Sequence, residues 1–318
     1  MDILVGYTGF VGSNLYKQHN FNSVLNSKNI ADAFGSNPDL CVYAGVYAEK
    51  FSADRFPEQD LIHINEALKN IRNINPKKLV LISTVDVIPS PQDKDIYENT
   101  QYKTDKLTPY GKNRLYLENE LRKIYPTVLI IRLPALFGEG LKKNFIYDLI
   151  NFIPVMLKKA KFAELCAQAP QLKDFYKENE NGFFRLAVNI IDDEKTMLKN
   201  LFVKLGFSAL NFTDSRSKFS FYNLKYLWEH INILLDNNIT LAHMATEPVS
   251  AGEIYHAVNN KDFTNKIMSE PFDYIFFKTK YSELFGRPDG YVFGRNDIIP
   301  ELTKFIINKT HEGEALNV

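Results

Sequence analysis

The first half of the chain alternates short apolar runs with longer amphipathic stretches. Each run is continuously apolar, which is typical of parallel strands that are buried on both faces of a sheet. The stretches between the runs have helical spacing near residues 12–19, 60–73 and 109–124. We therefore predict an α/β fold with a doubly wound parallel sheet. The predicted strands cover residues 3–5, 23–25, 40–43, 79–82 and 128–131.

The pattern changes after Leu133 and Pro134. Residues 141–212 hold several amphipathic stretches, rich in lysine and aromatic residues and without strand alternation, which predicts a smaller and mostly helical domain. Residues 223–236 then have helical spacing and residues 240–245 resemble a strand, so we expect the chain to return to the sheet. The predicted domains are 1–138 plus about 213–246, and about 139–212 plus 247–318.

Three glycines follow the first predicted strand at three-residue spacing. Gly6, Gly9 and Gly12 lie in the segment GYTGFVGSNL, which leads directly into a predicted helix. A turn of this kind needs glycine where a side chain would clash, and its N–H groups can bind a pyrophosphate. The alternative is a glycine-rich turn that only connects a strand to a helix. The position between two strands favours a dinucleotide site, to which Phe10 and Val11 would also belong.

Residues 26–28 lie about twenty positions beyond the first glycine, where a site that prefers NAD usually presents a carboxylate to the adenosine ribose. Here the sequence has Asn26, Ser27 and Lys28. An amide, a hydroxyl and a cation tolerate the additional phosphate of NADP, which a carboxylate would repel. The segment therefore favours NADP over NAD, with a solvated loop lysine as the alternative interpretation of Lys28.

Further segments within residues 1–145 follow in an order that resembles the extended short-chain dehydrogenase/reductases. This family, also described as NAD-dependent epimerases and dehydratases, modifies sugars carried on nucleotides. The resemblance implies a Rossmann domain that binds NAD(P), a substrate domain and a homodimer. It also implies cofactor contacts from Ala44, Gly45, Leu133 and Pro134. The segments that resemble the family, besides the glycine turn, are YAG at 43–45, ISTVDV at 82–87, YGKNR at 110–114 and RLPALFG at 132–138.

The resemblance assigns catalysis to Tyr110, which would exchange a proton with the reacting oxygen, and to Thr84, which would hydrogen-bond that oxygen. Because a free phenol has a pKa near ~10, the family places a lysine one helical turn later to stabilise the phenolate. This chain has Arg114 there, which keeps the charge but not the compact shape of lysine. By resemblance Arg114 tunes Tyr110 and holds the cofactor ribose. The alternative is an ordinary helix tyrosine beside a surface cation.

Asp86 lies two residues after Thr84, where the dehydratases of the family carry a catalytic acid. Those enzymes have a second acid immediately before it, and this chain has Val85, so the resemblance favours a reductase or an epimerase. A carboxylate that caps a loop is the alternative interpretation of Asp86. Asn144 resembles the family's asparagine that contacts the diphosphate of the substrate.

Charge and composition limit the other classes of function. The 318 residues include 38 basic and 38 acidic side chains, which argues against a general binder of nucleic acid or of anionic membranes. No secretory signal or run of ~18 apolar residues is visible, so we expect a cytoplasmic protein. The six histidines and two cysteines lack metal-ligand spacing. We expect no metal site, and buried thiols at Cys41 and Cys166.

These observations predict an NAD(P)-dependent enzyme that reduces or epimerises a nucleotide-activated sugar. The alternative is a protein of the same fold that binds the dinucleotide but has lost catalysis, and that serves in regulation or assembly. Arg114 is the feature that favours this alternative.

Overall fold

The computed structural model describes residues 1–89, 95–179, 181–187, 189–270 and 276–315. Its contacts divide the chain into two compact units. The first unit comprises residues 1–141, 218–249 and 276–301, and the second comprises residues 142–217, 250–270 and 302–315.

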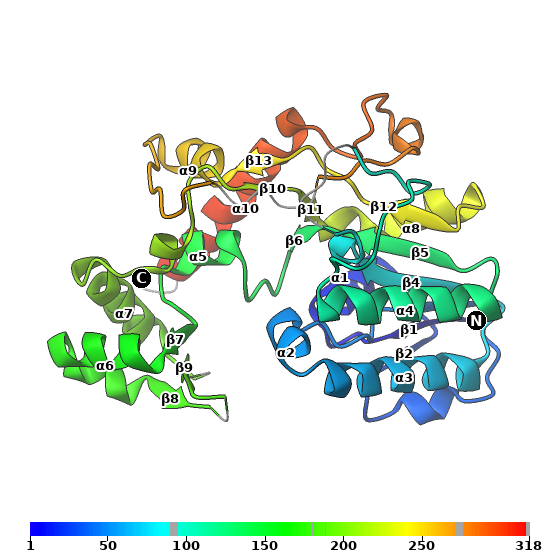
Figure 1. Ribbon diagram of the computed structural model, residues 1–318, viewed down its shortest axis with the longest axis horizontal. Helices are drawn as coiled ribbons and strands as arrows, with labels where there is room; N and C mark the ends of the chain where they lie inside the picture. Colours follow the sequence, from blue (N-terminus) through cyan, green and yellow to red (C-terminus); the bar gives the residue numbers. More distant parts are fainter. Residues whose placement is uncertain (90–94, 180, 188, 271–275, 316–318) are drawn as a thin grey trace. The chain divides into compact units, whose positions relative to one another are not determined.

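Six parallel strands form the central sheet of the first unit, in the order β12-β5-β4-β3-β1-β2 (Figure 1). The predicted α/β fold is confirmed. Because all the strands are parallel, their carboxyl ends lie at one edge of the sheet. The strands are β1 (Asp2–Val5), β2 (Ser23–Leu25), β3 (Leu40–Tyr43), β4 (Lys78–Thr84), β5 (Leu129–Leu133) and β12 (Leu241–His243).

Helices cover both faces of this sheet, and alternate side chains of each strand pack against opposite layers. Ile3 and Val5 of β1 pack with α3 and α4, whereas Leu4 packs with α1 and α8. Burial on both faces is the reason why the strands appear in the sequence as continuous apolar runs. The covering helices are α1 (Phe10–Gln18), α3 (Pro57–Ile74), α4 (Pro109–Ile124) and α8 (Leu227–Asp236).

Residues 276–301 belong to the first unit, although the sequence assigned all of 247–318 to the smaller domain. In this segment the Lys278 N–H donates to the Ile96 carbonyl oxygen at 2.8 Å. The Thr279 hydroxyl donates to a carboxylate oxygen of Glu98 at 2.6 Å. These contacts join positions nearly two hundred residues apart through turns that have no periodic pattern, so the sequence could not indicate them.

The second unit contains helices and a small antiparallel sheet, of order β7-β9-β8, that the sequence did not predict. The rings of Phe162 and Phe184 stack in its core with centroids 3.9 Å apart. Strands this short are too brief for an alternating pattern to be recognised. The elements are α5 (Phe145–Asn151), β7 (Met156–Lys158), α6 (Lys159–Gln168), β8 (Tyr176–Glu178), β9 (Phe183–Leu186), α7 (Asp192–Lys204) and α9 (Ala251–Asn259).

One long helix, α10, and several short elements complete the described chain. The remaining helices and strands are α2 (Lys50–Arg55), β6 (Ala135–Phe137), β10 (Lys218–Phe219), β11 (Phe221–Asn223), β13 (Val249–Ser250) and α10 (Arg295–Ala315). The 3₁₀ turns are η1 (Ile30–Ala33), η2 (Val85–Val87), η3 (Pro170–Asp174), η4 (Ala209–Phe212), η5 (Leu224–Tyr226) and η6 (Ser282–Phe285).

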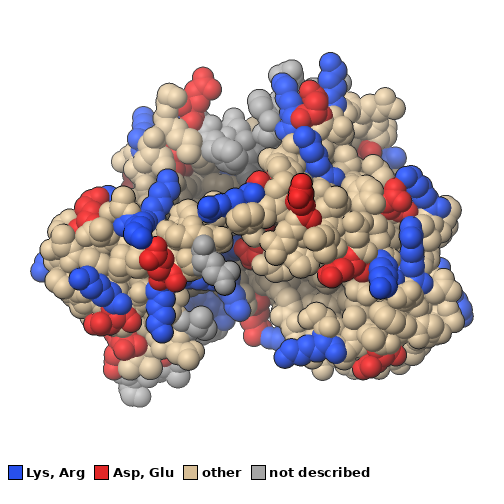
Figure 2. All heavy atoms as spheres, turned by 60° about the horizontal axis from the view of Figure 1, so that its bottom comes forward, with Lys and Arg blue, Asp and Glu red and all other residues tan. Residues whose placement is uncertain are grey.

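Charged side chains of both signs are interspersed on the face shown in Figure 2. Cys41 and Cys166 are free and buried, as predicted. Within the described ranges, no three His, Cys, Asp or Glu residues lie close enough to hold a metal ion. Among the helices of the described residues, none has the length and apolar character needed to cross a bilayer.

Two histidines of the first unit are buried, and burial lowers the pKa of each to about 4. His230 shares a hydrogen bond of 2.8 Å between its Nδ1 and the Tyr222 hydroxyl. An unfolded histidine has a pKa of ~6.5, so the unfolded chain binds more protons between pH 6.5 and 4. Each histidine therefore stabilises the folded protein above this range and loses that contribution as the pH falls through it.

We expect His230→Gln to lose less stability than the wild type on acidification. Between pH 7 and pH 5 the difference in the loss of unfolding free energy should be about 2 kcal/mol, because glutamine does not titrate. Urea unfolding of both proteins at the two pH values measures it. Equal losses would show that His230 is protonated in the folded protein, and His256→Gln, at an exposed position, serves as the control.

Candidate functional site

The residues predicted to bind a dinucleotide come together at the carboxyl edge of the central sheet. Gly6 follows β1, Ala44 and Gly45 follow β3, and Thr84 and Leu133 end β4 and β5. Parallel pairing of these neighbouring strands brings their ends to the same edge, where Pro134 also lies. This is the edge at which ligands bind in open α/β sheets.

The first turn is packed so closely that glycine is required at two positions. Gly6 has a φ of +91°, and a Cβ there would lie 2.6 Å from the carbonyl carbon and oxygen of Ala44. A Cβ at Gly12 would overlap the carbonyl oxygen of Gly6, whereas one at Gly9 would lie 3.3 Å from it. The backbone of β1 can thus turn directly into α1, which begins at Phe10.

The N-terminus of α1 fits a pyrophosphate. The first N–H groups of a helix have no partner within that helix, and their dipoles favour an anion. Phe10 and Val11 provide such groups directly beyond Gly9, whose exposed backbone leaves room for a ligand. The turn therefore has both features that a dinucleotide diphosphate needs, close backbone approach and free donors.

The segment after β2 reaches the same edge of the sheet. Asn26 is used in a local turn, where its side-chain oxygen accepts from the Lys28 N–H at 2.9 Å and its own N–H donates to Asn29 at 2.8 Å. The side chains of Ser27 and Lys28 are exposed. The side-chain groups that this segment exposes to a ligand are therefore the Ser27 hydroxyl and the Lys28 ammonium group.

Tyr110 lies in the first turn of α4, where local contacts fix it against the end of β4. The Tyr110 N–H donates to Asp54 Oδ1 at 2.9 Å, and the Thr108 hydroxyl caps the helix by accepting from Gly111 N–H at 3.3 Å. A Cβ at Gly111 would overlap the carbonyl oxygen of Asp86. This glycine therefore lets the start of α4 pack closely beside the turn that carries Asp86.

The Tyr110 side chain is buried beside Arg114. Tyr110 is 7% exposed, and the guanidinium carbon of Arg114 lies 4.3 Å from the centre of the phenol ring. Burial raises the pKa of Tyr110 to about 12, while Arg114 lowers it and Asp86 raises it. Arg114 is 4% exposed, so it is not the surface cation of the alternative interpretation.

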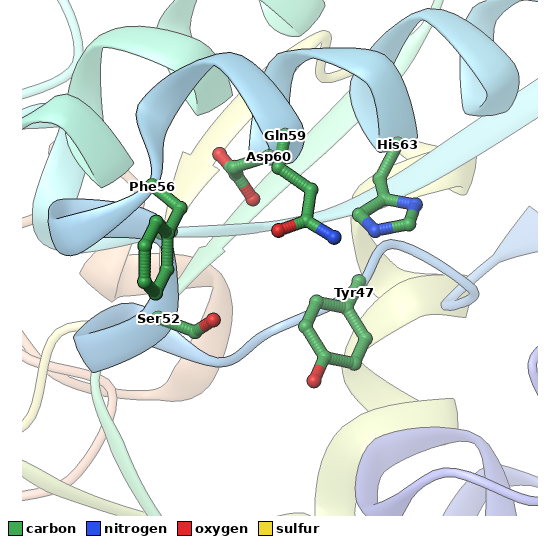
Figure 3. Close-up of a pocket in the computed structure, with 7 residues that line it drawn as sticks. Tyr47, Ser52, Phe56, Gln59, Asp60 and His63 are labelled. Carbon is green, nitrogen blue, oxygen red and sulfur yellow. The ribbon is translucent and has the colours of Figure 1, made fainter. Parts of the chain in front are cut away.

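Asp60, which the sequence analysis did not select, holds Arg114. Arg114 Nη1 and Nη2 donate to the two carboxylate oxygens of Asp60 at 2.9 and 3.0 Å, and Nη2 also donates to the Tyr47 carbonyl oxygen. Figure 3 shows Asp60 on α3 beside a small cavity that Tyr47 and His63 also line. One feature of the sequence indicates that Asp60 could bind a buried cation: it is a carboxylate in the first turn of an amphipathic helix.

Thr84 and Asp86 form one hydrogen-bonded turn. The Thr84 hydroxyl donates to Asp86 Oδ2 at 2.9 Å and accepts from the Asp86 N–H at 3.1 Å. Lys50 of α2 pairs with Oδ1 of the same carboxylate. Asp86 therefore has the contacts of a loop cap and also lies beside the first turn of α4, which carries Tyr110. Lys50, like Asp60, was not among the residues predicted from the sequence.

A buried ion pair fastens α4 to the sheet. Arg132 of β5 donates to Glu118 of α4 through Nη2 at 2.6 Å and Nε at 3.1 Å. The Ser83 hydroxyl, next to Thr84 in β4, donates to the same carboxylate at 2.7 Å. Through these contacts the helix that carries Tyr110 is fixed relative to the strand that carries Thr84.

Asn144 belongs to the second unit and begins α5. Its side-chain oxygen accepts from the Ile146 and Tyr147 N–H groups at 3.0 and 3.2 Å. The asparagine therefore caps a helix, and its contact with a substrate diphosphate stays a prediction.

No family model matches the chain, and neither does any curated protein sequence. Solved structures match it over nearly its whole length. RMD from Pseudomonas aeruginosa, complexed with NADPH, is 14% identical with a TM-score of 0.61, covering 98% of this chain and 99% of that one. dTDP-4-dehydrorhamnose reductase from Bacillus anthracis, in complex with NADP, is 14% identical with a TM-score of 0.59. The alignment covers 96% of this chain and 97% of the reductase.

UDP-glucose-4-epimerase from Stenotrophomonas maltophila, with bound NAD and formylated UDP-arabinopyranose, is 12% identical with a TM-score of 0.57. The alignment covers 99% of this chain and 98% of the epimerase. At these identities the likeness concerns the fold. The chain has the Rossmann-type fold that these reductases and epimerases share.

Proposed function

We propose that this chain is an NAD(P)-dependent enzyme of the extended short-chain dehydrogenase/reductase family that acts on a nucleotide-activated sugar. The observation that carries the proposal is the meeting of the glycine turn with Thr84 and Tyr110 at one edge of the sheet. The solved structures of the same fold support it, because they include reductases and epimerases in complex with NADPH, NADP or NAD.

In this proposal the turn from Gly6 to Gly12 binds the cofactor diphosphate, and the strand ends at 44–45 and 133–134 line the rest of its site. When bound, the nicotinamide exchanges a hydride with a carbon of the sugar. Tyr110 exchanges the proton with the oxygen on that carbon. Thr84 donates to that oxygen once its hydroxyl has turned away from Asp86, which accepts its proton in this structure.

The test is an assay with a panel of nucleotide-4-keto-sugars in the presence of NADPH or NADH. A reductase consumes the reduced cofactor, which its absorbance reports. An epimerase converts a nucleotide sugar to its isomer in the presence of NAD without net consumption, which chromatography reports. Cofactor binding without either reaction on any member of the panel would contradict an enzymatic function.

We propose that Lys28 favours NADP by binding its additional phosphate. Lys28→Ala should weaken NADPH binding about tenfold, or about 1.4 kcal/mol, because a charge-assisted hydrogen bond is lost. Binding of NADH should stay unchanged. Fluorescence titration with both cofactors measures the ratio, and Lys78→Ala, at the exposed start of β4, is the control. An equal effect on both cofactors would contradict a contact with the phosphate.

The resemblance also supports two proposals about assembly and substrate. The second unit would bind the nucleotide sugar, with Asn144 at its diphosphate, and helices α3 and α4 would pair across a two-fold axis in a homodimer. Sedimentation equilibrium measures the oligomeric state, and Asn144→Ala should raise the KM for the sugar nucleotide.

One observation favours the second candidate, a dinucleotide-binding protein without turnover. Arg114 donates to Asp60 and to the Tyr47 carbonyl oxygen, so much of its hydrogen-bonding capacity is used within the protein. Less of it is available for the ribose contact that the resemblance assigns. Tight NAD(P) binding together with no turnover would support this candidate.

A further inference from the structure

The charges around Tyr110 are arranged as two ion pairs. Arg114 lies over the phenol ring and forms a bidentate pair with Asp60, whose side chain is 3% exposed. Lys50 forms a pair with Asp86, next to the first turn of α4. The cation that lies over the tyrosine ring, Arg114, is thus accompanied by a carboxylate.

A paired cation acts differently on a phenol from a single one. The field of two opposite charges about 3 Å apart falls off much faster than that of one charge, so the pair stabilises a phenolate less. The bidentate geometry also fixes the guanidinium plane. Arg114 is therefore held at the ring of Tyr110 with part of its charge offset by Asp60.

We propose that Asp60 is a positioning residue that fixes Arg114 on the ring of Tyr110 and offsets part of its charge, which favours the protonated tyrosine that carbonyl reduction uses. This inference rests on the proposed function, and carbonyl reduction is the reaction in which we test it. A 4-keto-sugar nucleotide is then the class of substrate, and a hydroxyl sugar is the product.

The proton balance of this step is simple. The carbonyl carbon gains a hydride from the reduced nicotinamide, and the carbonyl oxygen gains the phenolic proton of Tyr110. The products are a hydroxyl group, the oxidised nicotinamide and a phenolate, which recovers a proton from water.

Epimerisation needs both forms of Tyr110, because a sugar hydroxyl is first oxidised and the ketone that forms is then reduced. It begins with removal of a proton from a sugar hydroxyl, for which the tyrosine must already be a phenolate. Burial raises the pKa of Tyr110 to about 12, so the protonated phenol predominates at pH 7. The protonated form is the one that carbonyl reduction uses.

The test is a set of substitutions that change one member of the ion pair at a time. Asp60→Asn keeps an oxygen for Arg114 but removes the negative charge, so the pKa of Tyr110 should fall. Arg114→Gln should raise it, and the double variant should return it near the wild-type value. Ultraviolet titration of each protein against its Tyr110→Phe counterpart isolates this tyrosine and needs neither cofactor nor substrate.

The control is Glu58→Gln, which makes the same charge change at an exposed position in the first turn of α3. It should leave the titration unchanged. In turnover, Asp60→Asn should move the alkaline limb of the pH profile for carbonyl reduction to lower pH by the same amount as the titration. A merely structural role would lower the rate without moving that limb.

The outcomes separate this inference from the proposed function. An unchanged Tyr110 pKa in Asp60→Asn overturns the role of Asp60, whether or not the protein turns over. A lowered pKa without reduction of any keto sugar overturns the proposed function and leaves the role of Asp60 standing. If Asp60→Asn fails to fold, the double variant with Arg114→Gln is used, because it buries no unpaired charge. A Tyr110 pKa below the wild-type value in the double variant overturns the inference.

Discussion

Tyr110→Phe is expected to lower kcat/KM for carbonyl reduction by about 10³-fold, within the range that general acid catalysis contributes. The ring is kept and only the hydroxyl is lost, so packing beneath Arg114 should be preserved. The affinity for the cofactor should change by less than about threefold, since the proposed role is in proton transfer. Steady-state kinetics and a binding titration measure the two effects separately.

Tyr116→Phe is the matched control, because Tyr116 lies on the same helix with an exposed side chain. It should retain wild-type kcat/KM. Full activity in Tyr110→Phe would remove this residue as the proton donor, and an equal loss in both variants would indicate damage to α4 instead of loss of chemistry.

Gly12→Ala is expected to lower dinucleotide affinity at least about 100-fold, or about 2.7 kcal/mol. Its Cβ would overlap the carbonyl oxygen of Gly6, which belongs to the backbone and cannot rotate away. The turn must therefore open, which should also lower the unfolding free energy by about 1–3 kcal/mol. Fluorescence titration with NADPH and NADH, together with urea unfolding, measures both losses.

Gly9→Ala provides the graded comparison within the same turn. Its Cβ would lie 3.3 Å from that oxygen, which a small shift relieves. We expect stability close to that of the wild type and weaker cofactor binding, since the added methyl group stands where the diphosphate approaches. Equal destabilisation by the two alanines would contradict the packing described for this turn.

The sequence predicts the central sheet well because burial on both faces requires apolar residues at successive positions of each strand. Strands such as β3 and β4 are apolar at successive positions, and no other local structure explains such short runs between helical stretches. The glycine turn is equally visible, since its steric requirement is local to residues 6–12. Parallel topology then brings Thr84 and Tyr110 towards that turn without further information.

The surroundings of Tyr110 are less accessible to sequence analysis. Asp60 is 54 positions from Arg114, and its place on the apolar face of its helix does not show which cation it meets. Lys50 reaches Asp86 from a short helix that has no pattern of its own. Ion pairs of this kind depend on tertiary packing between helices, whereas strand patterns and tight turns depend on neighbours in the chain.

The central claim is that the turn after β1 binds the diphosphate of a nicotinamide dinucleotide. Isothermal titration calorimetry of the wild type and of Gly12→Ala, each with NADPH, NADP, NADH and NAD, tests it most directly. We predict saturable binding of at least one form by the wild type, at one site per chain, and its loss in the variant. Absence of binding heat with all four forms, or equal binding by the two proteins, would contradict the claim.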